Sequence, residues 1–68
     1  MKLEYDKNVD AAYIYFKYPI EDGEVENTIE LNENIILDFD ASGKLLGVEI
    51  LNASKILGKK TIQEAIVA

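Results

Sequence analysis

Apolar and polar residues alternate along most of the chain, which is the pattern of strands that bury one face. The alternation is clearest in residues 35–51, IILDFDASGKLLGVEIL, where two alternating runs flank a stretch of turn-forming residues. Gly43 in that stretch takes a positive φ at no steric cost. The pattern predicts a β-hairpin, and we expect the other strands to be arranged around it.

Two lengths of the hairpin loop are compatible with these residues. A three-residue loop pairs Asp40 with Lys44 and places charged residues opposite apolar ones. A four-residue loop pairs Asp40 with Leu45 and gives one face that is entirely apolar. We therefore expect the four-residue loop, with the apolar pairs Phe39–Leu46, Leu37–Val48 and Ile35–Ile50.

The same register places the only unusual chemistry on the other face of the hairpin. Asp38 lies opposite Gly47 and Ile36 lies opposite Glu49, so the two carboxylates are diagonal neighbours, roughly 7–8 Å apart between backbones. Gly47 leaves the surface beside them open, which predicts a small ligand site at Asp38 and Glu49. The alternative is that both carboxylates are solvated and that Gly47 marks a bulge or a close approach by a partner.

Five consecutive strands are predicted, and short turns join most of them. In the second strand we expect Ala12, Ile14 and Phe16 to face the core, with Tyr13 and Tyr15 on the opposite face. Neighbours in sequence are expected to pair, which gives an antiparallel meander. The predicted strands cover residues 1–5, 11–17, 24–31, 35–40 and 45–51.

The alternation ends after Leu51. Residues 52–58 predict one or two helical turns, with Asn52 as the N-cap and Gly58 as the C-cap. The sequence Thr61-Ile62-Gln63-Glu64 fits a capping box that starts a second short helix through residue 67. The alternative is that Ile66 and Val67 form an extended tail. The expected fold is α+β: a single domain, residues 1–68, with a small antiparallel β-meander of about five strands followed by one or two short C-terminal helices.

Composition adds a prediction about assembly. The chain has 68 residues, 49% of them hydrophobic, and no cysteine. A core of this size supplies only about 3–5 kcal/mol, and no disulfide is available to add to it. We therefore expect a homodimer or a permanent partner to bury the surplus apolar surface.

The charge balance bears on partners and location. Thirteen acidic residues oppose seven lysines, with no arginine, for a net charge of −6. Nucleic-acid binding requires basic residues and is not expected, whereas a basic protein partner fits. The N-terminus lacks the apolar segment of a signal peptide, and no apolar run is long enough to span a membrane, so we expect a cytoplasmic protein without membrane contact.

Catalysis is not expected. The chain has no histidine, and its serines and threonines lack an adjacent base to activate them. We expect no cofactor either. A hard cation such as calcium or magnesium is the alternative, held by Asp38, Asp40 and Glu49, although no loop offers the six to eight oxygens that calcium takes.

A binding surface is the better-supported functional prediction. Tyr13, Tyr15, Ile36 and Leu51 are all expected on the face away from the core. Such a half-apolar face with tyrosines is typical of a protein interface. The alternative is that the C-terminal helix folds back and covers this face, which makes these residues part of the core.

Three blocks of the sequence resemble a known family. They are Tyr5-Asp6-Lys7, then DAAYI at residues 10–14, and DFDASGKLLGVEILNAS at residues 38–54. They are similar to the blocks "YD", "DALYI" and "DYDADGRLVGIEILNAS" of domain of unknown function family 2283, and the similarity extends over residues 3–57. The chain departs from the family pattern at Ala12, where leucine is usual, and at Tyr15, where a basic residue is common.

The resemblance implies a sheet with a C-terminal helical piece and brings no defined reaction. Some family members look like the antitoxin half of small toxin–antitoxin pairs. Together with the net charge of −6, the resemblance makes neutralisation of a small basic toxin the specific expectation. The departure at Ala12 thins the core, and the departure at Tyr15 makes the outer face more aromatic and less charged.

Overall fold

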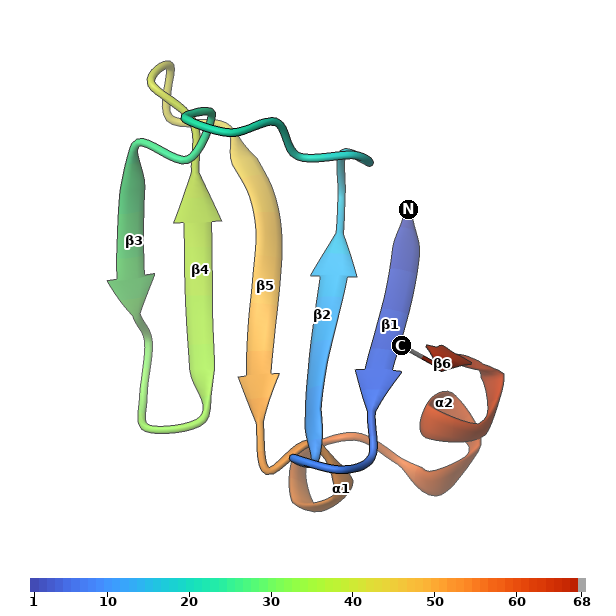
Figure 1. Ribbon diagram of the computed structural model, residues 1–68. Helices are drawn as coiled ribbons and strands as arrows, with labels where there is room; N and C mark the ends of the chain where they lie inside the picture. Colours follow the sequence, from blue (N-terminus) through green and yellow to red (C-terminus); the bar gives the residue numbers. More distant parts are fainter. Residues whose placement is uncertain (68) are drawn as a thin grey trace.

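The computed structural model describes residues 1–67, in which a six-stranded sheet carries two short helices at one end (Figure 1). Five antiparallel strands followed by two short helices confirm the predicted α+β class. The strands are β1 (Lys2–Asp6), β2 (Ala11–Tyr15), β3 (Asn27–Glu30), β4 (Ile35–Phe39), β5 (Leu45–Leu51) and β6 (Ile66–Val67). The helices are α1 (Ala53–Ile56) and α2 (Lys59–Glu64).

The order of the strands differs from a meander. It is β3-β4-β5-β2-β1-β6, so β5 lies between β4 and β2, and β3 lies at the edge. The segment between β2 and β3 crosses one end of the sheet and makes this order possible (Figure 1). The physical reason is that β5, the longest strand, is apolar enough to be paired on both sides. The β2–β5 pairing sets Ala12 against Ile50 and Ile14 against Val48.

The central hairpin combines the two loop lengths considered above. Near the turn, Phe39 pairs with Leu45, and the Asp40 N–H donates to the Lys44 carbonyl at 2.9 Å, as in the three-residue loop. The expected Phe39–Leu46 pair is therefore wrong. A β-bulge leaves Leu46 without a partner on β4 and advances the register by one residue. The rest of the predicted register is confirmed: Asp38–Gly47, Leu37–Val48, Ile36–Glu49 and Ile35–Ile50.

The register divides the sheet into two faces of different character. The face that we call the aliphatic face is mostly apolar and carries Leu3, Tyr5, Ala12, Ile14, Asn27, Ile29, Ile35, Leu37, Phe39, Val48 and Ile50. The opposite face, which we call the tyrosine face, carries Lys2, Glu4, Asp6, Ala11, Tyr13, Tyr15, Thr28, Glu30, Ile36, Asp38, Gly47, Glu49 and Leu51. The expected placement of the two β2 tyrosines opposite Ala12 and Ile14 is thus confirmed.

The core lies on the aliphatic face, where α1 packs against β2 and β5. Ala12, Ile50 and Ala53 are its buried centre, and Ala53 has no exposed surface. Two alanines at this contact let the short helix approach the sheet closely. Helix α2 lines a hollow with Tyr5, which is on the aliphatic face too, so the alternative that placed the C-terminal helix over the tyrosine face is wrong. Asn27, which pairs with Phe39, is exposed like the rest of β3 and has access to water.

The C-terminal segment departs from its predicted caps. Asn52 is the N-cap residue of α1, with φ 53°, but its side chain makes no capping hydrogen bond. Helix α2 starts after Gly58, so Thr61 lies inside it and the expected capping box is absent. The chain then becomes extended, as in the alternative considered above, and β6 pairs in parallel with β1. Pairing with this sheet edge gives the backbone partners that a frayed helix end lacks.

Candidate functional site

The tyrosine face is centred on Tyr13, whose ring lies across Gly47 and reaches Asp38. The Tyr13 hydroxyl donates to Asp38 Oδ2 at 2.6 Å, which links β2 to β4 across the intervening strand β5. Only a glycine at position 47 permits this path, because an added Cβ would lie 2.6 Å from Tyr13 Cζ and closer still to Tyr13 Cε1 and the hydroxyl oxygen. Burial, followed by the hydrogen bond to Asp38, raises the pKa of the Tyr13 phenol.

This arrangement corrects the picture of an open patch beside Asp38 and Glu49. The predicted register places Asp38 opposite Gly47 and Glu49 opposite Ile36, as expected. The surface above Gly47, however, is filled by the Tyr13 ring. Both oxygens of Asp38 accept hydrogen bonds, one from Tyr13 and the other from the Thr28 hydroxyl at 2.8 Å. The close approach by a partner, one of the alternatives at Gly47, is therefore made by the chain's own Tyr13.

A second tyrosine extends the same network toward β1. The Tyr15 hydroxyl donates to Glu4 Oε1 at 2.9 Å, and burial is the main cause that raises the pKa of Tyr15. The rings of Tyr13 and Tyr15 are 4.7 Å apart, and Tyr18 meets Tyr15 edge-on at 5.0 Å. Lys2 Nζ lies 3.7 Å from the centre of the Tyr18 ring, a cation–π contact. The result is a continuous aromatic surface held in place by carboxylates.

Ile36 and Leu51 complete the predicted binding surface. Ile36 lies opposite Glu49, and Leu51 lies opposite Ala11, so both are on the tyrosine face. The four residues expected to bind a partner, Tyr13, Tyr15, Ile36 and Leu51, are therefore on one face, and each is half-buried. The sequence did not indicate that the tyrosine hydroxyls are held by Asp38 and Glu4.

The proposed cation triad does not form. Asp40 leaves the strand and holds the hairpin turn, where its Oδ1 accepts from the Ser42 N–H, the Ser42 hydroxyl and the Lys44 N–H. These bonds, the one from Lys44 first, hold the pKa of Asp40 below its usual value. Within residues 1–67, no group of three or more acidic side chains is placed to hold a metal ion. Asp38, Asp40 and Glu49 thus do not make a cation site.

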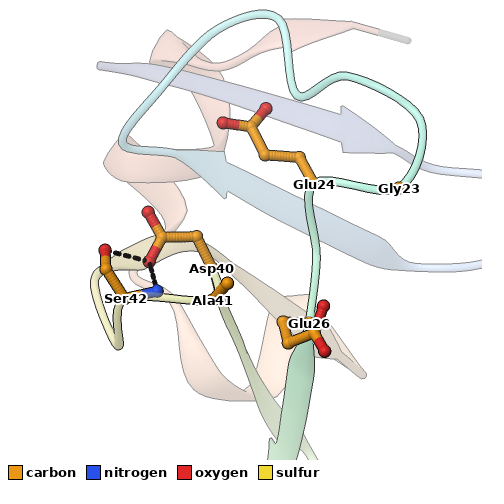
Figure 2. A pocket seen from close by; sticks show the side chains of 6 residues that line it. All are labelled: Gly23, Glu24, Glu26, Asp40, Ala41 and Ser42. Carbon is orange, nitrogen blue, oxygen red and sulfur yellow. Dashed lines mark hydrogen bonds between the residues drawn. The ribbon is translucent and has the colours of Figure 1, made fainter.

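Asp40 also borders a shallow hollow of about 370 Å³ beside the turn (Figure 2). In Figure 2 the Glu24 and Glu26 side chains come from the segment leading into β3, and Asp40 is directed at Ser42. Glu24 binds Lys17 at 2.8 Å, and this bond is the main cause that holds the pKa of Glu24 low. The acidic groups Glu24 and Asp40 thus satisfy local hydrogen bonds, and the hollow has the character of a solvated loop surface.

A cluster that the sequence reading missed joins the two ends of the chain. Asp10 has a left-handed backbone conformation, with φ 52°. Its carboxylate accepts hydrogen bonds from the Tyr5 hydroxyl at 2.8 Å, from the Ser54 hydroxyl at 2.7 Å and from the Ser54 N–H at 3.0 Å. Its own carbonyl accepts from the Ala53 N–H at 2.9 Å. Asp10 thereby supplies the cap that Asn52 does not. The bonds from Ser54, then Tyr5, lower the pKa of Asp10.

All three side chains of this cluster belong to the sequence blocks that resemble the family, and this shared membership could have indicated the cluster. Tyr5 lies in the first block, Asp10 opens the second, and Ser54 ends the third. These three side chains meet in space although 44 positions separate Asp10 from Ser54. Their hydrogen bonds fix α1 on the sheet, so these three residues of the blocks have a structural role.

Comparison with known proteins finds relatives of unknown function. The family described as "Protein of unknown function (DUF2283)" matches residues 2–54. The chain belongs to this family. It is also 38% identical over 56 residues to an uncharacterised protein of Methanocaldococcus jannaschii, a match that covers 82% of this chain and 44% of that protein. The chain thus spans less than half the length of that relative. No solved structure matches the chain significantly.

The family match ends at Ser54, the residue whose hydroxyl and N–H bind Asp10. The DUF2283 region therefore contains the five antiparallel strands and the start of α1. Neither the family nor the relative brings an activity. Across residues 1–67, the helices fall short of the length and apolar character needed to cross a membrane.

Proposed function

We propose that the protein is a non-enzymatic interaction module that binds a basic protein through its tyrosine face. The observation that supports this proposal is the joint character of that face. It combines the aromatic rings of Tyr13 and Tyr15 with the half-buried apolar residues Ile36 and Leu51, while α1 packs on the opposite face. Tyrosines held in fixed positions lose little conformational entropy on binding.

The charges of this face favour a basic partner. Glu4, Glu30, Asp38 and Glu49 are on its strands, and Lys2 is their only basic neighbour on those strands. The whole chain carries −6. Complementary charge accelerates encounter with a positively charged protein and suppresses binding to nucleic acid. The resemblance of some DUF2283 members to antitoxins makes neutralisation of a small basic toxin the specific form of this proposal.

The experiment is to mix the protein with the product of the neighbouring gene, pass the mixture over a sizing column and titrate the pair by calorimetry. Glu49→Lys is the test variant, because Glu49 lies among the tyrosines and apolar residues of the face. Glu33→Lys is the matched control, with the same change of charge in an exposed turn. We expect Glu49→Lys to weaken binding more than about tenfold and Glu33→Lys to have little effect.

Two outcomes contradict the proposal. Elution of the two proteins as separate species refutes the toxin-neutralising form. A complex that Glu33→Lys and Glu49→Lys weaken equally shows that charge alone acts and that the tyrosine face is not the binding surface. Circular dichroism of both variants verifies that each is folded.

A further inference from the structure

The aliphatic face is only half covered. Helix α1 and its neighbours pack over β2 and β5, but within residues 1–67 no helix lies over β3 and β4 at the far end of the sheet (Figure 1). Ile29, in the middle of β3, is 51% exposed, and Leu31, which follows on the same side, is 62% exposed. Among the residues described, only Ala12, Leu46, Ile50 and Ala53 are buried hydrophobic residues. A sheet with one apolar face is stable when a second layer covers that face.

The dimensions of the molecule show how much surface is left uncovered. Its accessible surface is 4752 Å², whereas a monomer of 7.6 kDa is expected to expose about 4,300 Å². Its radius of gyration is 11.9 Å, against about 10.9 Å for a globular chain of this length. The shortest dimension is 17 Å. The excess of roughly 450 Å² is more than half of the ~800 Å² that each partner contributes to a standard interface.

The distribution of charge indicates what covers this face. In the strands described, every charged side chain of β2–β5 is on the tyrosine face, and the aliphatic face of β3, β4 and β5 carries none. A basic protein therefore gains no charge pairing here. A second copy of the chain meets an equally uncharged surface, and Glu30, Asp38 and Glu49 of its strands are on the opposite face. The face is thus suited to self-association.

We propose that two copies of this chain form a dimer by packing the aliphatic faces of their β3–β4–β5 halves against each other. The two sheets make a sandwich with the paired faces inside and the two tyrosine faces outside. Such an interface is isologous, with the same patch used on both copies. Ile29, Leu37 and Phe39 supply its centre, and Leu31 lies at its edge. The dimer does not depend on the function proposed above, since it uses the opposite face.

The test measures mass in solution over a range of concentrations by sedimentation velocity. The wild-type chain is expected to reach the mass of a dimer. Ile29→Lys places an unpaired charge in the interface and is expected to raise the dissociation constant more than about tenfold. Because Ile29 is already half exposed in one copy, the change leaves the fold of the monomer intact. Glu30→Lys is the control, since Glu30 is also exposed on β3 but faces the other way.

A second measurement uses the absence of cysteine from the chain. Ile29→Cys and Glu30→Cys each introduce one thiol, and its rate of reaction with a maleimide is measured below and above the concentration of half-dimerisation. We expect the thiol at position 29 to react several-fold more slowly in the dimer and the thiol at position 30 to react at the same rate throughout. A wild-type monomer at every concentration, a dimer that Ile29→Lys leaves intact, or equal protection of both thiols overturns the proposal.

Discussion

Substitution of Gly47 by alanine tests the contact on which the tyrosine face depends. The new Cβ would lie 2.6 Å from Tyr13 Cζ, so the ring must move and its hydroxyl loses Asp38. A hydrogen bond to a charged acceptor contributes about 1.5–3 kcal/mol. Alanine recovers about 0.5–1 kcal/mol, because glycine is unfavourable inside a strand. We expect Gly47→Ala to lower the free energy of unfolding by about 1–2 kcal/mol.

The assay is urea denaturation followed by far-UV circular dichroism. With a urea slope of about 1 kcal/mol per molar for a chain of this size, the midpoint should fall by about 1–2 M. The decisive comparison repeats the substitution in a Tyr13→Val background, where valine keeps the strand propensity and removes the ring. There Gly47→Ala should stabilise the protein by about 0.5–1 kcal/mol.

The coupling between the two positions is therefore expected to be about 2 kcal/mol. A coupling below about 0.5 kcal/mol, which is the range of independent sites, would show that the ring does not occupy the space above Gly47. Sedimentation of each variant provides the control, since the dimer interface proposed above lies on the other face and should be unchanged.

Two further predictions concern Asp10 and the titration of the fold. Asp10→Asn keeps a residue that tolerates the left-handed backbone but loses the charge, and Asp10→Ala loses both. The free energy of unfolding should fall from the wild type to Asp10→Asn and again to Asp10→Ala. The Ser54 amide should exchange its hydrogen faster in both variants, and an unchanged exchange rate would contradict its bond to Asp10. Because the pKa of Asp10 is lowered, the stability it contributes is present above about pH 4 and lost as the pH falls below that. The pKa of Tyr13 is raised, so its contribution is intact below about pH 10 and falls at higher pH as the unfolded phenol ionises. The urea midpoint, measured as a function of pH, should fall at acid pH and again at alkaline pH. Tyr13→Phe should reduce the alkaline fall, and an unaltered alkaline fall would refute its assignment to Tyr13.

The faces of the sheet could be predicted from the sequence, but the order of its strands could not. Alternation along residues 35–51 gave the pairs Leu37–Val48 and Asp38–Gly47 correctly. It could not reveal that β5 pairs with β2 as well, because that contact depends on apolar rows matched across distant segments. The bulge at Leu46 could not be predicted from the sequence either. Because the bulge adds one unpaired residue to β5, the turn has a three-residue loop while the rest of the hairpin keeps the predicted register.

The candidate site was predicted only in part, because it depends on both the register within the hairpin and the order of the strands. The placement of Tyr13, Asp38 and Glu49 on one face follows from register and was correct. That the Tyr13 ring reaches Asp38 over Gly47 requires β2 beside β5, which the expected meander did not contain. The Asp10–Ser54 contact also depends on that adjacency. These two missed contacts therefore arose from the error in strand order, whereas the cation triad failed because Asp40 leaves the strand and holds the hairpin turn.

The pairing of β2 with β5 also sets the order in which the chain can fold. Strands β1 and β2 form a local hairpin, and β3, β4 and β5 form a second local unit, so each closes only short loops. Joining the two units closes a much longer loop, whose entropy cost must be met before the contact becomes favourable. The Tyr13–Asp38 bond, the Ser54–Asp10 bond and the Ala12–Ile50 contact all span this junction. We therefore expect the two units to join late in folding, and the Tyr13–Asp38 bond of the tyrosine face is one of the contacts that hold them together.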